Sequence, residues 1–393
     1  MSLPYYISWT KQNGAATFEI ETAQDAIITT RDGKKIIDMT SISYQAHFGH
    51  SPKIIINKIK NQLDLLPMTS PKGRFPLKDA STTRLLNYMQ KPDGKIFYTT
   101  GGAETIENAL KIARDFTKKK VVLARKNSYH GATMGALSVT GDWRNPPHQL
   151  PNDWVVRIPE PTEPNSFQSI EKIIEQVGAQ NVAAIILETI TGGNGVIIPS
   201  KEWLKSISDV CKKNQILLIM DEVVCGFMRT GLPFGYMHFN VEPDLICLAK
   251  GITGGMIPFG ALWTSKAIAD YYEENILCCG LTNYAHPLGI AAMSGVLDIV
   301  EDNEFNQNLK NRISDFQLYL EELKTLSIVK EIRQIGMLCA VDLHHSVDGK
   351  KFLNEGVYLV SQTNRIIIAP PLIINHDDLK TAMKIIFNVL KNN

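Results

Sequence analysis

One short stretch, Gln215 to Val223, places strict limits on the fold of this chain. Its apolar residues Ile216 to Met220 are followed directly by the carboxylates Asp221 and Glu222. A segment that is apolar at every position is buried on both faces, as central strands of parallel sheets are. Ligands of such sheets bind in the crevice beyond the carboxyl ends of the strands. The stretch therefore predicts a central parallel strand that carries Asp221 to a binding site.

A second stretch, Asp244 to Lys250, repeats this pattern and ends in a lysine. Two strand ends then present a carboxylate and an amine. A cofactor with a pyridine nitrogen at one end and an aldehyde at the other uses both groups, and pyridoxal phosphate is such a cofactor. Charged residues at strand ends more often mark an ordinary loop boundary, so these two stretches alone leave that alternative open.

Strand-like and helix-like segments alternate from Val121 onward, which is typical of an α/β domain with a mostly parallel sheet. A hairpin is expected around Asp32-Gly33. The expected strands are 16–20, 26–30, 36–39, 95–100, 121–124, 182–188, 215–223, 244–250, 336–343 and 366–372. Helical periodicity is present in a segment that opens at residue 51 and in the separate segments 79–90, 104–118, 169–177, 201–213, 285–325 and 376–391. The proline-rich residues 141–168 are expected to form loops.

A candidate phosphate site follows the strand expected at 95–100. Gly101-Gly102-Ala103 lies between that strand and a helix with an amphipathic pattern. A helix N-terminus offers free N–H groups and a positive dipole end to a phosphate. Two glycines also simply make a tight turn, so this motif is weak by itself. Tyr129, just after the next strand, could lie flat on a cofactor ring or be an ordinary core residue.

Composition excludes several classes of protein. The chain has 393 residues, a formal net charge of +1 and 44% hydrophobic residues, as a large globular protein has. Nucleic acids and anionic membranes require a basic surface, so neither is expected as a partner. We expect neither a transmembrane segment nor a signal peptide. The six cysteines form no C-x-x-C pair, which fits reduced thiols in the cytoplasm. His344-His345 have no further residues at metal-ligand spacing, so we expect no metal site.

Taken together, the motifs resemble those of class III pyridoxal-phosphate aminotransferases of fold type I. The resemblance covers nearly the whole chain, and its motifs occur in the family's order. They are Gly101-Gly102-Ala103-Glu104, Ser128-Tyr129-His130-Gly131-Ala132-Thr133, Glu188 to Gly195, Asp221-Glu222-Val223, Gly226-Phe227 with Arg229-Thr230-Gly231, Pro243 to Gly251, Gly280-Leu281-Thr282 with His286-Pro287-Leu288, and Ala369-Pro370-Pro371-Leu372.

The resemblance implies a role for each matching residue. Lys250 forms the Schiff base with the cofactor and then carries the proton, and Asp221 pairs with the pyridine nitrogen. Val223 and Tyr129 pack on the two faces of the ring. The further positions that it assigns are His130 beside Tyr129, Gly102 and Ala103 at the phosphate, Thr282 reaching the phosphate from the partner subunit of a homodimer, and Glu188 near the cofactor hydroxyl.

Physical chemistry supports the two central roles independently. A buried aspartate keeps the ring nitrogen protonated, so that the ring can accept electrons from the substrate carbon. Burial beside a cationic ring lowers the pKa of an amine, which makes Lys250 competent as a base.

The chain departs from the family pattern in three places. Ile106 and Met228 replace Asn and Gly, and both changes concern packing. Relatives that bind an α-carboxylate with arginine place it where this chain has Ile367. Arg365 could face the same side of that strand. The chain thus resembles the β-alanine/taurine:pyruvate-type ω-aminotransferases, with Trp9 as a candidate wall of the substrate pocket.

The expected reaction is ping-pong transfer of a terminal amino group from an ω-amino acid or amine to a small 2-oxo acid such as pyruvate. An aminomutase, racemase or decarboxylase would keep the same motifs. A nucleotide-binding oxidoreductase is a further alternative, although the chain lacks G-x-G-x-x-G after a first strand. Residues 1–60 and 285–393 are expected to build a smaller α+β domain from both termini, and residues 61–284 the large cofactor-binding domain.

Overall fold

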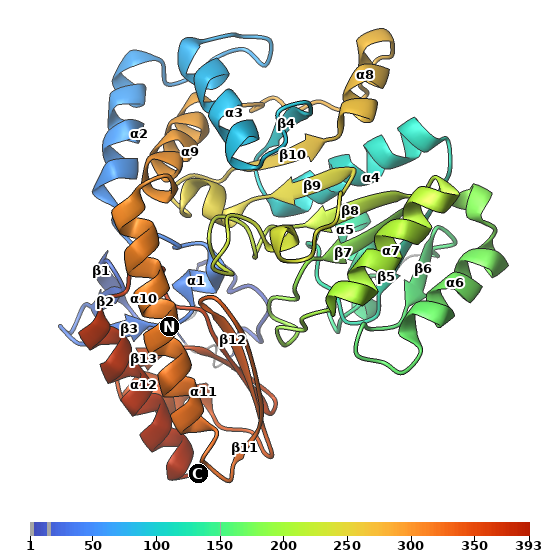
Figure 1. Ribbon diagram of the computed structural model, residues 1–393. Helices are drawn as coiled ribbons and strands as arrows, with labels where there is room; N and C mark the ends of the chain where they lie inside the picture. Colours follow the sequence, from blue (N-terminus) through green and yellow to red (C-terminus); the bar gives the residue numbers. More distant parts are fainter. Residues whose placement is uncertain (1–3, 14–16, 150) are drawn as a thin grey trace.

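The computed structural model describes residues 4–13, 17–149 and 151–393 (Figure 1). Its largest sheet has the strand order β4 (Lys95–Thr99), β10 (Gly260–Thr264), β9 (Leu245–Leu248), β8 (Leu217–Asp221), β7 (Val182–Glu188), β5 (Val121–Arg125) and β6 (Val155–Ile158). Neighbouring strands from β6 to β9 are parallel, and β10 runs antiparallel to both β9 and β4. The expected α/β fold with a mostly parallel central sheet is confirmed.

Two separate apolar cores cover the two faces of this sheet. One contains residues of α4 (Gly102–Thr117), α5 (Met134–Val139) and α8 (Lys266–Glu274). The other contains residues of α6 (Ser166–Val177) and α7 (Lys201–Asn214) and continues into the rest of the molecule. Successive residues of a strand point to opposite faces, so Leu218 and Ile219 of β8 belong to different cores. Both faces are therefore covered, as the unbroken apolar strands require.

Segments from both ends of the chain form two smaller sheets. The first has the order β1 (Ile20–Gln24), β2 (Ile27–Thr30), β3 (Lys35–Asp38) and β13 (Val357–Tyr358), so a C-terminal strand completes an N-terminal hairpin. The second has the order β11 (Val329–Ile335), β12 (Leu338–Leu343), β15 (Arg365–Ile368) and β14 (Val360–Gln362). This arrangement confirms a smaller α+β part built from both termini.

The remaining helices connect and cover these sheets (Figure 1). They are α2 (Lys53–Leu65), α3 (Pro76–Tyr88), α9 (Pro287–Val300), α10 (Asn303–Leu323), α11 (Gly349–Asn354) and α12 (His376–Lys391). Helices α2 and α3 both pack on α9. The boundary expected at 60/61 falls inside α2, and the domain boundaries remain a prediction. No helix in the described ranges is long and apolar enough to cross a membrane.

Three expected elements differ in the structure. The strand expected at 16–20 begins only at Ile20 and continues to Gln24. Residues 17–19 are not part of a strand, and residue 16 lies outside the described ranges. Residues 141–168 are not all loop, because β6 forms there as an edge strand whose short apolar run is followed by Pro159. The strand expected at 366–372 ends at Ile368, since Pro370 and Pro371 have no N–H to donate to a ladder.

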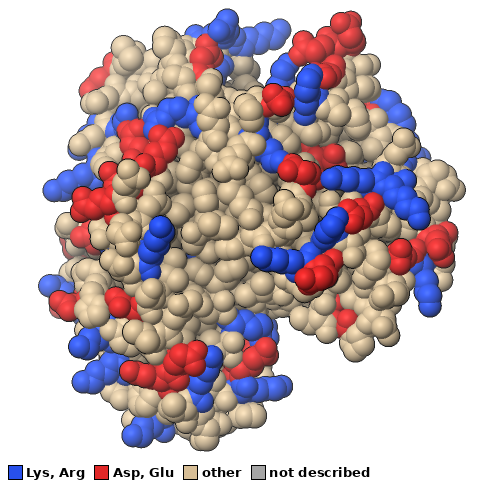
Figure 2. Space-filling model, viewed as in Figure 1, with Lys and Arg blue, Asp and Glu red and all other residues tan. Residues whose placement is uncertain are grey.

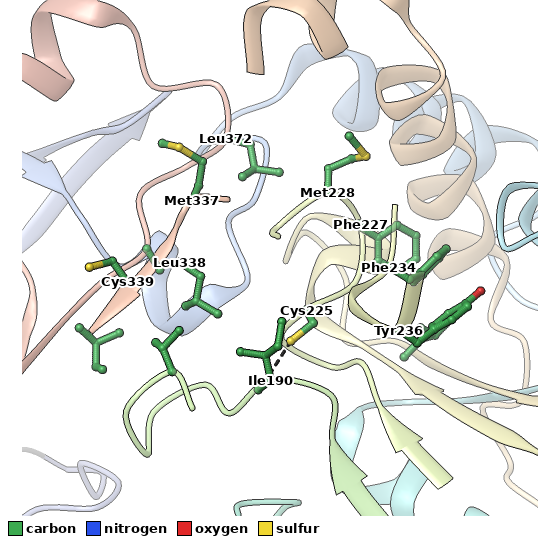
Figure 3. Packing of buried hydrophobic residues seen from close by; sticks show 14 of the residues in the cluster. Ile190, Cys225, Phe227, Met228, Phe234, Tyr236, Met337, Leu338, Cys339 and Leu372 are labelled. Atoms are coloured by element: carbon green, nitrogen blue, oxygen red, sulfur yellow. Dashed lines mark hydrogen bonds between the residues drawn. The ribbon is translucent and has the colours of Figure 1, made fainter. Parts of the chain in front are cut away.

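Residues of the loop after β8 join the large sheet to the C-terminal segments. Figure 3 shows Phe227, Phe234 and Tyr236 on one side and Met337, Leu338, Cys339 and Leu372 on the other. The Cys225 thiol donates to the Ile190 carbonyl at 3.2 Å. Because all of these residues belong to one continuous core, the C-terminal segments are held against the loop that follows β8.

A buried arginine from the same loop reinforces this connection. Arg229 Nη1 donates to the carbonyls of Met337 (3.0 Å) and Pro370 (2.7 Å), and Nη2 donates to Ser41 Oγ (3.0 Å). Burial lowers the pKa of Arg229 to about 9, so the side chain remains a cation at neutral pH. One guanidinium thus ties three segments that are distant in sequence.

The segment that Arg229 contacts has an unusual backbone. Residues Ser41 to Tyr44 (labelled α1) have φ values of 49°, 42°, 59° and 67°, which places four consecutive non-glycine residues in the left-handed region. Such a conformation costs roughly 1–2 kcal/mol per residue. The Asp38 carboxylate compensates by accepting hydrogen bonds from the N–H groups of Thr40 (2.8 Å) and Ile42 (2.9 Å). The turn carries Tyr44 to the edge of the main cavity.

Acidic and basic side chains are mixed over the face that Figure 2 shows, as expected for a net charge of +1.

Candidate active site

The carboxyl ends of the central strands meet at one cavity of about 490 Å³. Parallel pairing places Glu188, the last residue of β7, directly beside Asp221, the last residue of β8. Lys250 follows β9, the next strand in the sheet. The sequence-predicted residues that line this cavity are Trp9, Gly102, Ala103, Tyr129, His130, Glu188, Asp221, Val223 and Lys250. Thr282 and Arg365 are not among the lining residues.

Asp221 is a buried carboxylate with fixed orientation. Its Oδ1 accepts the N–H of Val223 at 3.0 Å, and its Oδ2 lies 2.8 Å from His130 Nδ1. A carboxylate has about four lone-pair sites, so these two contacts leave room for one more N–H donor. His130 and Val223 therefore aim Asp221 at the cavity without saturating it.

Lys250 is a half-buried residue in a strained backbone position, with φ at +48°. Burial lowers the pKa of its ammonium group and the charge of Arg144 lowers it further, whereas Asp221 and Glu188 act in the opposite direction. The Nζ atom lies 5.1 Å from the centre of the Tyr44 ring. A lowered pKa enlarges the neutral fraction of the amine, and the neutral form is the one that attacks a carbonyl or accepts a proton.

Glu188 connects two loops at the cavity wall. Its Oε1 accepts the N–H of Tyr129 at 3.1 Å, and its Oε2 accepts the N–H of Gly192 at 3.0 Å. Burial raises the pKa of this carboxyl, while Arg125 and His130 lower it. The carboxyl thus fixes the backbone that carries the Tyr129 ring.

The start of helix α4 forms the anion-binding end of the cavity. Gly101, Gly102 and Ala103 line this end of the cavity. The first backbone hydrogen bond of the helix is donated by the Thr105 N–H to the Gly101 carbonyl. The preceding N–H groups are free of intrahelical partners, as at any helix N-terminus. A Cβ on Gly102 would lie 3.2 and 3.3 Å from the two methyl groups of Val223. Glycine at this position keeps the floor of the cavity open.

These residues fit pyridoxal phosphate. The helix end suits the phosphate, Asp221 suits the pyridine nitrogen, and Lys250 suits the aldehyde. Tyr129 and Val223 line the same cavity. One cavity thus offers a complementary group for each chemical feature of the cofactor.

Arg365 and Thr282 lie elsewhere. Arg365 donates to Asp342 through Nε and Nη2 and to the Asn194 carbonyl through Nη1 (3.2 Å), so its guanidinium is engaged outside the cavity. Thr282 is exposed. Their assigned roles remain predictions.

Sequence reasoning missed several residues of the cavity wall, Arg144 and Tyr44 above all. Arg144 belongs to the proline-rich region that was expected to be loop only, and Tyr44 depends on the left-handed turn. An arginine next to a tryptophan in that region was the available clue to Arg144.

The family model "Aminotransferase class-III" matches residues 9–390. The chain belongs to the class III aminotransferases. The enzyme therefore performs pyridoxal-phosphate-dependent transamination. An omega-aminotransferase from Caulobacter vibrioides is 29% identical, over 92% of this chain and 90% of that protein. An ornithine aminotransferase from Oceanobacillus iheyensis is 30% identical, over 95% and 94%.

Solved structures of this class of aminotransferase share the fold. A taurine:2-oxoglutarate aminotransferase from Bifidobacterium kashiwanohense, in complex with PLP and glutamate, has a TM-score of 0.92 at 30% identity, covering 98% of this chain and 94% of that one. An amine transaminase from an uncultivated Pseudomonas species, in a PLP-bound form, has a TM-score of 0.93 at 26% identity, covering 100% and 99%. The agreement over the whole length confirms fold type I for this aminotransferase.

Proposed function

We propose that this aminotransferase moves a terminal amino group from an ω-amino acid or amine to a small 2-oxo acid such as pyruvate, by a ping-pong mechanism. The observation that carries the proposal is Ile367, a buried residue of β15 that lines the cavity. Its position is the one at which α-carboxylate-binding relatives are expected to have arginine. Val360, Ile257 and Phe259 line the same cavity and add to its apolar surface. An apolar wall favours a short acceptor over one with a second carboxylate.

Each protein group has a distinct task in this proposal. The bound cofactor supplies the ring that accepts electrons from the substrate carbon. Lys250 would take the proton from the substrate carbon and give it back, because the amine that it offers to this cavity can act as both base and acid. Asp221 holds the positive charge on the ring nitrogen. Tyr129 and Val223 would contact the ring, and the start of α4 would hold the phosphate.

The choice of acceptor tests the proposal. With β-alanine as donor, we expect kcat/KM for pyruvate to exceed that for 2-oxoglutarate by about tenfold or more, because 2-oxoglutarate must desolvate a second carboxylate against the apolar wall. Coupled assays of alanine and glutamate formation measure both rates. A preference for 2-oxoglutarate would contradict the proposal, and the Bifidobacterium relative described as a taurine:2-oxoglutarate enzyme makes this a sharp comparison.

We further propose that the enzyme is a homodimer with shared active sites. Thr282 is exposed and lies outside the cavity of its own chain, which suits a residue that reaches the phosphate of a partner. The large apolar side chains of Leu65, Met68 and Ile276 are strongly exposed in the single chain. Light scattering should give about twice the 43.8 kDa chain mass. A monomer that binds the cofactor with full affinity would exclude this arrangement.

A further inference from the structure

Arg144 lies in an aromatic cage beside the cofactor cavity. Its guanidinium carbon is 4.5 Å from the centre of the Tyr129 ring, 4.8 Å from that of Trp143 and 5.2 Å from that of Trp9. Trp9 in turn contacts Tyr129 and Trp143 edge to face, at centroid distances of 6.5 and 5.9 Å. Aromatic groups that hold a guanidinium reduce the freedom it would lose on binding a ligand.

The cage leaves part of the guanidinium available. Nη1 is paired with the Asp142 carboxylate. Nε is buried, yet it has no hydrogen-bond partner among residues 4–13, 17–149 and 151–393. A buried donor without a partner costs free energy in the unliganded protein. The Arg144 side chain is 15% exposed, whereas Trp9 and Trp143 are 48% and 55% exposed. Arg144, Trp9 and Tyr129 line the cavity, so this part of the cage faces it.

The charges around the cavity indicate what Arg144 binds. Among the described lining residues, the acidic and basic side chains are Arg144, Glu188, Asp221 and Lys250. Lys250 and Asp221 match the two ends of the cofactor, and Glu188 is tied to backbone N–H groups and lies 3.7 Å from Arg125. Arg144 is the remaining cation, and the Asp142 carboxylate with which it pairs is not among the lining residues. The planar fork of a guanidinium matches a carboxylate.

We propose that Arg144 binds the carboxylate of the amino donor through the part of its guanidinium that lines the cavity, with its aromatic cage holding the side chain in place. The proposal rests on the proposed function, since it takes the donor to be an ω-amino acid. It assigns substrate recognition to the loop after Thr140 instead of to Arg365 on β15.

Arg144→Gln tests the proposal through a matched pair of donors. For β-alanine, kcat/KM should fall about 100-fold, because a charge-assisted, two-point contact is lost. For propylamine, which has the same chain length without the carboxylate, it should change less than about threefold. Arg144→Lys should give an intermediate loss with β-alanine, since it keeps the charge without the fork. Arg31→Gln is the control. Arg31 lies in the turn between β2 and β3, and its exposed charge pairs with Glu19, so this variant should keep the wild-type kcat/KM for both donors.

A binding measurement separates this proposal from the proposed function. Propionate carries the acid group without an amine, and it should quench the tryptophan fluorescence of the wild-type holoenzyme saturably through Trp9 and Trp143. The quenching should be absent in Arg144→Gln. Equal losses for β-alanine and propylamine, or unchanged propionate binding, would overturn the assignment. Wild-type enzyme that binds propionate through Arg144 but does not transaminate β-alanine would refute only the proposed donor.

Discussion

Replacing Lys250 by alanine should reduce transamination by about 10⁴-fold or more, because the same amine holds the cofactor and moves the proton. The absorbance band expected near roughly 410–420 nm for a cofactor bound to a lysine should disappear at the same time. Asp221, the start of α4 and Tyr129 remain in place, so the variant should still bind the cofactor, without the covalent link. Spectra before and after gel filtration, together with single-turnover rates, measure both effects.

Lys119→Ala is the matched control for this prediction. Burial also lowers the pKa of Lys119, but its Nζ donates to the carbonyls of Ala179, Asn214 and Gln215 and does not line the cavity. The control should lose some stability and keep the absorbance band. A persistent band in Lys250→Ala would show that another amine holds the cofactor, and the assignment of the site would then be wrong.

Asp221→Asn should lower the rate of the first half-reaction by about 10²- to 10³-fold, the range found when a preorganised electrostatic contact is removed. Asparagine has nearly the shape of aspartate but no negative charge, so it does not hold a proton on the ring nitrogen. His130 and Val223 should keep the side chain in place. The lysine-bound absorbance band should therefore remain while conversion by β-alanine becomes slow.

Asp244→Asn provides the comparison for Asp221. Asp244 precedes β9 at the opposite end of the strand from Lys250 and accepts the N–H of Leu218 at 2.9 Å. Its replacement should lower the melting temperature and leave the half-reaction within about threefold of wild type. If Asp221→Asn were equally active, a charge at this position would not be needed and the proposed task of Asp221 would be refuted.

Sequence reasoning succeeded where burial alone determines structure. The strands that end at Glu188 and Asp221 and the strand before Lys250 are apolar throughout, so their burial and parallel pairing could be predicted, and the convergence of their ends followed. Gly102 and Tyr129 each follow another strand of this sheet, but their roles were inferred from the family resemblance, because a glycine turn and a tyrosine after a strand are weak signals by themselves.

The rest of the cavity depends on contacts that leave little local pattern. Residues Ser41 to Tyr44 adopt left-handed backbone angles without a glycine, so nothing in their composition marks the turn. Arg144 becomes a candidate only when the fold brings Trp9 and Tyr129 to it from separate segments. Edge strand β6 was hidden by the surrounding prolines, because an edge strand needs only a few apolar residues.

The buried contacts of Arg229 have a consequence for synthesis on the ribosome. The chain emerges from its N-terminus, so Ser41, β8 and Lys250 leave the exit tunnel before Met337 and Pro370, the carbonyl partners of Arg229. Until those partners emerge, Arg229 lacks the carbonyls that join it to the C-terminal segments, and Ile367 has not yet closed the cavity wall. The nascent enzyme therefore acquires a complete cofactor cavity only near the end of translation, although its reactive lysine is made much earlier.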